Sequence, residues 1–126
     1  MKQKDKKLLL KDLCARLPYG VKCEVKYYDG AWELLAIYTN GTTYAARDIG
    51  YPIETYFEDC KPYLFPLSSM TEEQLSHYIT TLKYNKEIGE MIETLDTFDY
   101  LNKNHFDYRG LIPMGMAIDA TGLNIY

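Results

Sequence analysis

The stretch that decides the fold is residues 20–49, GVKCEVKYYDGAWELLAIYTNGTTYAARDI. Two dipeptides, Asp29-Gly30 and Asn40-Gly41, divide it into three runs rich in β-branched and aromatic residues. Asp-Gly and Asn-Gly are the preferred pairs for two-residue hairpin turns, because both central positions need a positive φ. The stretch therefore predicts three antiparallel strands connected as a meander.

The spacing of apolar residues predicts the register of the first hairpin. A two-residue turn at Asp29-Gly30 places apolar residues opposite one another at every second position. The predicted pairs are Tyr27–Trp32, Val25–Leu34, Cys23–Ala36 and Val21–Tyr38. A one-residue slip would turn this set to the other face of the sheet. We therefore expect the second strand to bury Trp32, Leu34, Ala36 and Tyr38.

The opposite face of the same sheet also carries apolar residues. A two-residue turn at Asn40-Gly41 leaves four of them on the outer face, namely Leu35, Ile37, Tyr44 and Ala46. An antiparallel sheet with one face in water normally shows polar side chains there. Either later segments of the chain cover these four residues, or they form an interaction patch for a partner.

A helix is predicted at the N-terminus. Leu9, Leu13 and Leu17 recur at four-residue steps within residues 4–17, and Pro18 follows the last of them. The first 17 residues hold six basic and two acidic side chains, a net charge of +4, whereas the whole chain carries −4. A solvated helix face explains the basic run. Because nucleic-acid binders normally have a basic balance, we do not expect nucleic acid as the partner.

Two or three helices are predicted after the meander. Thr71 and Gln74 have capping-box spacing and begin a helix that continues to about residue 84. Apolar residues keep helical spacing over residues 86–105, as one kinked helix or as two helices with a fresh cap at Thr94 or Asp96. Three prolines in residues 50–67 exclude a central strand there and allow only an edge strand at 63–65.

Length and composition bound the fold class. The chain has 126 residues, 47% hydrophobic and 25% charged, which is typical of one globular domain spanning residues 1–126. We expect an α+β fold: an N-terminal helix, a three-stranded antiparallel meander with room for a fourth edge strand, and two to three C-terminal helices packed on the sheet. No apolar run is long enough for a signal peptide or a membrane span, so we expect a cytoplasmic protein without membrane contact.

One segment concentrates reactive side chains. His105, Asp107, Tyr108 and Arg109 lie within one turn of chain at a predicted helix end. An imidazole, a carboxylate, a phenol and a guanidinium together suit acid–base chemistry or anion binding. In a purely structural role, Asp107 would pair with Arg109, and His105 and Arg109 would bond the last helix carbonyls. The segment is therefore a candidate ligand or anion site, with no residue assigned as catalytic.

The cysteines and histidines predict neither a metal site nor a cofactor. Cys14, Cys23 and Cys60 form no C-x-x-C pair, and the two histidines lie in different predicted helices. Cys14 and Cys23 occupy apolar positions, where free cysteine packs as a small hydrophobe. Cys60, between Asp59 and Lys61, is the thiol expected to be exposed.

Three longer strings carry a resemblance. They are LPYGVKCEV (17–25), KPYLFPLSSMTEEQ (61–74) and FDYLNKNHFDYRGLIPMGMAIDA (98–120). In these strings the chain resembles a group of small uncharacterised proteins found in gut anaerobic bacteria and on their phages and mobile elements. The resemblance implies a bacterial or phage-encoded intracellular protein. It brings no activity, cofactor or catalytic residue to any numbered position.

The sequence favours a non-enzymatic accessory or protein-interaction module. Thirteen tyrosines and the outer-face apolar residues suit a protein partner or self-association. No phosphate-binding loop, nucleophile elbow or metal motif is present in the sequence. The alternatives are an enzyme or anion-binding protein centred on the His105–Arg109 segment and a weak nucleic-acid binder that uses the basic helix.

Overall fold

The structure is a computed structural model that describes all residues from 1 to 126. Its two sheets and three helices confirm the α+β class. The helices are α1 (Gln3–Arg16), α2 (Glu72–Thr80) and α3 (Leu95–Lys103). The strands are β1 (Lys22–Val25), β2 (Ala31–Ile37), β3 (Thr42–Ala46), β4 (Ile53–Tyr56), β5 (Cys60–Pro66), β6 (Lys83–Asn85), β7 (Glu90–Ile92), β8 (Phe106–Asp107) and β9 (Ile118–Asp119).

The main sheet is mixed, in the order β4-β3-β2-β1-β5-β8, with β9 also paired to β5. The meander has four antiparallel strands, and β5 lies inside the sheet, so the exclusion of a central strand from residues 50–67 is wrong. Pro62 is the last residue of β5 that pairs with β1, and Pro66 is the last residue of the strand, so each missing N–H falls at the end of a run of pairs. Cys60–Pro62 pair with β1, Tyr63 and Leu64 with β9, and Phe65 and Pro66 with β8.

The first hairpin differs from its predicted register by an even number of residues. Cys23 pairs with Trp32, where the sequence predicted Ala36. The connection is a five-residue loop, Lys26–Gly30, with Tyr27 at φ 72° and Gly30 at φ 87°. Because strand side chains alternate with period two, an even shift keeps each residue on its predicted face. Trp32 and Leu34 are accordingly buried, as expected.

A β-bulge at Leu35 turns the side chains that follow it in β2 to the face opposite the predicted one. Before the bulge Leu34 pairs with Ala45, and after it Ala36 pairs with Tyr44. The connection is a four-residue loop, 38–41, with Gly41 at φ 88°, a conformation that glycine adopts readily. Ala36 is therefore only partly buried and Tyr38 is 51% exposed, so the expected burial of these two residues is wrong.

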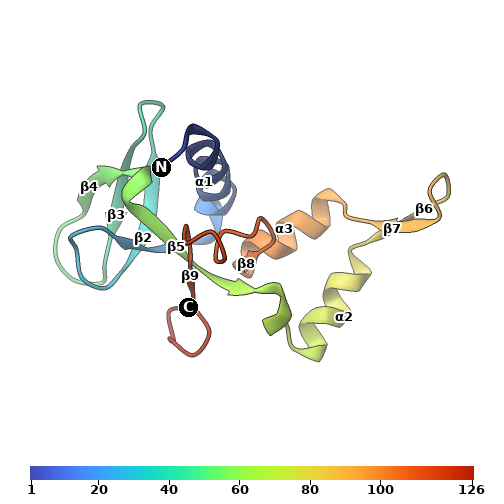
Figure 1. Cartoon of the computed structure of the whole chain (residues 1–126). Coiled ribbons are helices and arrows are strands. Elements are labelled where there is room, and N and C mark those ends of the chain that lie inside the picture. The colour runs from blue at the N-terminus through green and yellow to red at the C-terminus, as the bar shows by residue number, and fades with distance from the viewer.

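The core lies between α1 and one face of the main sheet (Figure 1). Leu9 and Leu13 of α1 pack there against residues of the meander, of β5 and of the segment after α3. The core residues are Leu9, Leu13, Val21, Cys23, Val25, Trp32, Leu34, Ala45, Cys60, Leu64, Leu111, Met116 and Ala117. The N-terminal helix thus provides the layer that the sequence assigned to the C-terminal helices.

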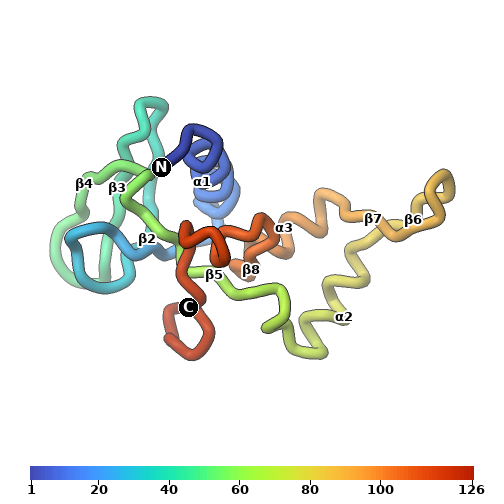
Figure 2. The backbone as a smooth tube through the Cα atoms, viewed as in Figure 1, coloured from blue at the N-terminus to red at the C-terminus, as the bar shows by residue number.

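The segment between β5 and α3 extends away from the sheet. Figure 2 shows the chain leaving β5, running through α2 to the β6–β7 hairpin and returning along α3. The prediction that α2 packs on the sheet is wrong, because no residue from 71 to 95 is buried. Residues 86–105 contain the second strand of a hairpin followed by one helix, with Thr94 as its N-cap. We call residues 71–95 the arm.

Candidate functional site

The four side chains predicted as a ligand or anion site do not converge on one point. His105 lies two residues after the end of α3 and has φ 60°, and its ring stacks on the Tyr126 ring with centroids 3.8 Å apart. The Asp107 carboxylate accepts the backbone N–H groups of Leu111 and Ile112, each at 2.9 Å. Asp107 therefore organises the following turn. No acid–base pair forms between it and His105.

Arg109 and Tyr108 belong to an ion-pair network with α1. Arg109 Nη1 donates to Asp12 Oδ1 at 2.8 Å and to the Tyr108 hydroxyl at 2.7 Å. Arg16 donates through Nε to Asp12 Oδ2 at 2.9 Å and through Nη2 to the Phe106 carbonyl at 2.6 Å. The expected pairing of Asp107 with Arg109 is wrong, because α1 brings the Asp12 carboxylate to Arg109.

Sequence reasoning missed the role of Asp12 and Arg16. Both residues are fully buried, although the basic N-terminal run predicted a solvated helix face. Their spacing of four residues, next to the Leu9–Leu13 stripe, was the available signal. Charges so deeply buried require close partners, and Asp12 pairs with both guanidiniums, while Arg16 Nη1 has no hydrogen-bond partner. These groups therefore have a structural role and are not free to bind a ligand.

His105 lines a depression of about 420 Å³ between β5, the end of α3 and the C-terminal segment. Burial and the positive charge of Arg16 lower the pKa of His105 to about 4, so its ring is neutral at pH 7. Lys103 is the one charged residue in the lining. The depression thus presents a neutral imidazole with no carboxylate to orient it, which is a poor arrangement for acid–base catalysis.

The predicted interaction patch on the outer face of the sheet does not form as one surface. The bulge turns Ile37 to the core side, where it packs against the buried cluster. Leu35 is 48% exposed, whereas Tyr44 and Ala46 are half-buried. Tyr44 instead packs edge-to-face with the exposed Tyr38, with ring centroids 5.6 Å apart. The four predicted residues are therefore divided between two faces.

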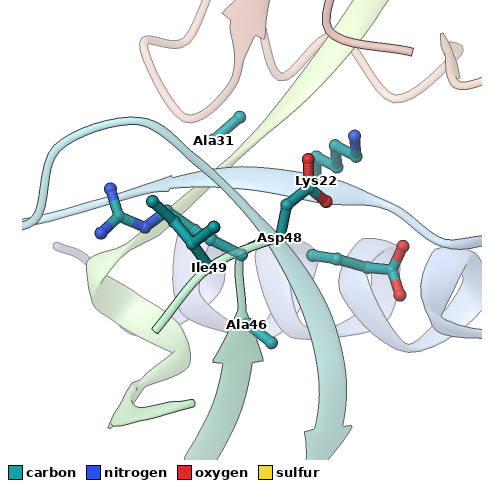
Figure 3. Close-up of a pocket in the computed structure, with 7 residues that line it drawn as sticks. Lys22, Ala31, Ala46, Asp48 and Ile49 are labelled. Carbon is teal, nitrogen blue, oxygen red and sulfur yellow. The ribbon is translucent and has the colours of Figure 1, made fainter. Parts of the chain in front are cut away.

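A polar depression of about 330 Å³ lies at one end of this outer face (Figure 3). Lys22 of β1, residues of β2 and β3 and the following loop through Asp48 and Ile49 line it. Arg47, also in the lining, is already engaged, because its guanidinium lies 4.5 Å from the centre of the Trp32 ring. Opposite charges are balanced around this depression, so it shows no preference for a ligand of either sign.

The arm is the largest concentration of exposed apolar side chains outside the sheet. Seven large hydrophobic residues there are between 37% and 84% exposed, namely Leu75, Ile79, Tyr84, Ile88, Met91, Ile92 and Leu95. Exposed large apolar side chains gathered on one segment are uncommon on monomeric proteins and mark interaction sites. The arm is therefore the strongest candidate for a functional surface.

Hydrogen bonds hold the base of the arm against α3. The Thr94 and Thr97 hydroxyls donate to the Thr81 carbonyl at 2.9 and 3.1 Å. The Tyr100 hydroxyl donates to the Gln74 carbonyl at 3.3 Å. Thr71 and Gln74 form the predicted capping box at the start of α2. The base is thus anchored by polar contacts, and the apolar side chains of the arm remain without a covering layer.

A second surface feature lies on α1. Lys4, Lys7, Leu8 and Lys11 line one side of this helix and, together with Met114 from the segment after α3, border a groove of about 480 Å³. The three lysines are exposed and Leu8 is half-buried. The groove therefore has an apolar floor and a basic rim. We call it the α1 groove.

The chain matches no protein-family model, and no curated protein or solved structure matches it. Its functional interpretation accordingly depends on the geometry of its own residues.

The remaining candidate groups are dispersed. Cys60 is fully buried and Cys14 is exposed, the reverse of the expectation for both thiols. Cys60 is covered because β5 lies inside the sheet. No three side chains among the histidines, cysteines, aspartates and glutamates are grouped closely enough to hold a metal ion. None of the helices combines the length and apolar composition needed to cross a bilayer.

Proposed function

We propose that this chain is a non-enzymatic protein-interaction module whose docking element is the arm. The observation that carries the proposal is the exposure of the seven large apolar side chains on a segment with no buried residue. Water contact with this much apolar surface is unfavourable by about 25 cal/mol per Å², and binding a partner removes it. The resemblance to small bacterial and phage-borne proteins suits an accessory role.

The net charge of the arm indicates what charge its partner's surface should carry. Residues 71–95 contain five glutamates and two lysines, a net charge of −3. Complementary potentials steer encounter and exclude wrong partners. The partner surface is therefore expected to combine an apolar floor with a basic rim.

Photocrosslinking tests the proposal directly. A photoreactive amino acid replaces Ile88, which is 58% exposed on the arm, or Tyr51. Tyr51 is 91% exposed on the body, which comprises all residues outside the arm, and serves as the matched control. Irradiation in the native cells should produce a protein adduct at position 88 and none at position 51. If position 88 yields no adduct, or only the pattern seen at position 51, the arm is not a docking element.

A further inference from the structure

The depression beside His105 has the size and the composition of a small-ligand site. Its volume of about 420 Å³ lies within the range of pockets that hold small molecules. We propose that it binds a small aromatic carboxylate, whose oxygens accept hydrogen bonds from Lys103, His105 and Gln74. This binding function is separate from docking by the arm, and neither depends on the other.

The lining of the depression contains one positive charge and no acidic side chain. Lys103 supplies the charge, and it is exposed and forms no salt bridge. Glu73 and Asp99 line an adjoining groove that also reaches Lys103, but neither lies within ion-pair distance of its ammonium. An unpaired cation beside a concave surface attracts an anion to that surface.

His105 is the most buried polar side chain in the lining, and its Nδ1 has no hydrogen-bond partner. Arg16 lies close by, because its Nη2 donates to the carbonyl of Phe106. The ring is neutral at pH 7, since burial and the charge of Arg16 lower its pKa to about 4. A nitrogen lone pair is more favourable near a guanidinium than an N–H is, so the proton should reside on Nε2. Nε2–H is then the donor that a molecule in the depression can reach.

The capping box of α2 leaves a further donor free. Gln74 Oε1 accepts the Thr71 backbone N–H at 2.9 Å, which fixes the orientation of the side-chain amide. The Nε2 end of that amide is thereby left for a ligand in the depression. Ser69 and Asn104, also in the lining, already donate to backbone carbonyls. Three free donors with no competing acid suit the two oxygens of a carboxylate.

Aromatic rings form the apolar part of the depression. The Phe65 ring centroid lies 6.3 Å from that of Phe106 and 6.1 Å from that of Tyr126, and all three residues line it. The Tyr126 hydroxyl is engaged, because it donates to the Tyr63 carbonyl and accepts the Lys22 backbone N–H. The rings therefore offer apolar contact, and a flat aromatic ring packs well against other rings. This favours a carboxylate with an aromatic body over an inorganic anion.

Fluorine NMR with para-fluorobenzoate as the probe tests the inference on the whole chain. The probe resonance should shift and broaden as protein is added. The uncharged para-fluorobenzamide, which has the same shape, should bind about tenfold more weakly. Lys103→Gln should weaken benzoate binding by about the same factor. Lys4→Gln, at an exposed lysine of the α1 groove, is the matched control and should bind the probe like wild type.

The two nitrogens of His105 provide an independent check. Nitrogen NMR of the free protein should place the proton on Nε2, and the probe should shift Nε2 more than Nδ1. A proton on Nδ1, equal affinity for benzoate and benzamide, or no binding of benzoate would each overturn the inference. So would equal effects of Lys103→Gln and Lys4→Gln. If the probe binds as expected while position 88 forms no crosslink, the proposed function fails and this inference stands.

Discussion

The body of this protein and its arm use similar side chains in opposite ways. In the body, α1 and the main sheet enclose a cluster of thirteen buried apolar residues. In the arm, α2 carries Leu75 and Ile79 at helical spacing, yet both are about half exposed. An amphipathic pattern therefore predicts a helix but does not determine whether anything covers its apolar face.

The two regions are consequently stabilised by different interactions. The body gains its stability from apolar burial and from the Asp12 network, which link segments far apart in the sequence. The arm depends on hydrogen bonds, namely the capping boxes at Thr71 and Thr94 and the contacts that hold its base against α3. Segments with few buried contacts open independently of the global transition. We therefore expect the arm to open without unfolding of the body.

The largest expected effect is in the body. Asp12→Ala leaves two guanidiniums without their carboxylate and should lower the free energy of unfolding by about 3–5 kcal/mol. Urea unfolding followed by the fluorescence of the buried Trp32 measures it. Asp48→Ala, at an exposed residue, should change stability by less than about 0.5 kcal/mol. Equal effects of the two variants would refute the structural role of the network.

The stability of the body should vary with pH through the ionisation of His105. Its pKa is lowered from 6.5 to about 4 by burial and by Arg16, so folding favours the neutral ring. This contribution is fully present above pH 6.5 and is lost as the pH falls toward 4, a change of about 3 kcal/mol. His105→Asn should flatten this part of the stability profile. Identical profiles for wild type and His105→Asn would contradict the assignment.

The turn between β2 and β3 should show a smaller effect. Gly41 has φ 88°, and a β-carbon there would lie 3.3 Å from the Phe57 ring. Gly41→Val should therefore destabilise the body by about 1–2 kcal/mol, because a β-branched residue is strained in this conformation. The Trp32 unfolding curve measures the loss. Gly50 also has a positive φ, but no atom lies within 4 Å of a β-carbon placed there. The loss of stability in Gly50→Val therefore measures backbone strain without the clash.

The helix cap of the arm should affect the arm alone. Thr71 Oγ1 accepts the Gln74 backbone N–H at 3.1 Å. Thr71→Ala should weaken α2 by about 1 kcal/mol, as loss of an N-cap normally does. Hydrogen exchange should speed up at the α2 amides while the Trp32 unfolding curve stays unchanged. A shift of that curve would mean that arm and body unfold together.

The smallest effect on stability is expected at the exposed face of α2. Ile79→Ser should change the free energy of unfolding by less than about 0.5 kcal/mol, because Ile79 is 52% exposed. Leu13→Ala, on the apolar stripe of α1 and fully buried, should lower it by about 2–5 kcal/mol. Urea titration of both variants makes the comparison. If Ile79→Ser lowered the free energy of unfolding as much as Leu13→Ala does, the exposed face of α2 would have to be covered.

Local signals in the sequence identified much of the secondary structure. The N-terminal helix, the strands flanking both Gly-containing turns and the caps at Thr71 and Thr94 all depend on residues a few positions apart. Propensity, capping and side-chain periodicity act over that range. The register of the first hairpin was wrong by an even number of residues, and for that reason the faces of Trp32 and Leu34 were still correct.

Only the tertiary structure decided which surfaces meet. The bulge at Leu35 moves Ile37 to the core side, and the partners of β5 allow a proline-containing strand inside the sheet. The network joins Asp12 to Arg109, 97 positions away, which no local pattern encodes. The arm lacks a covering layer because α1 already occupies the apolar face of the sheet. Burial depends on contacts between distant segments, whereas sequence periodicity reports only which face of an element is apolar.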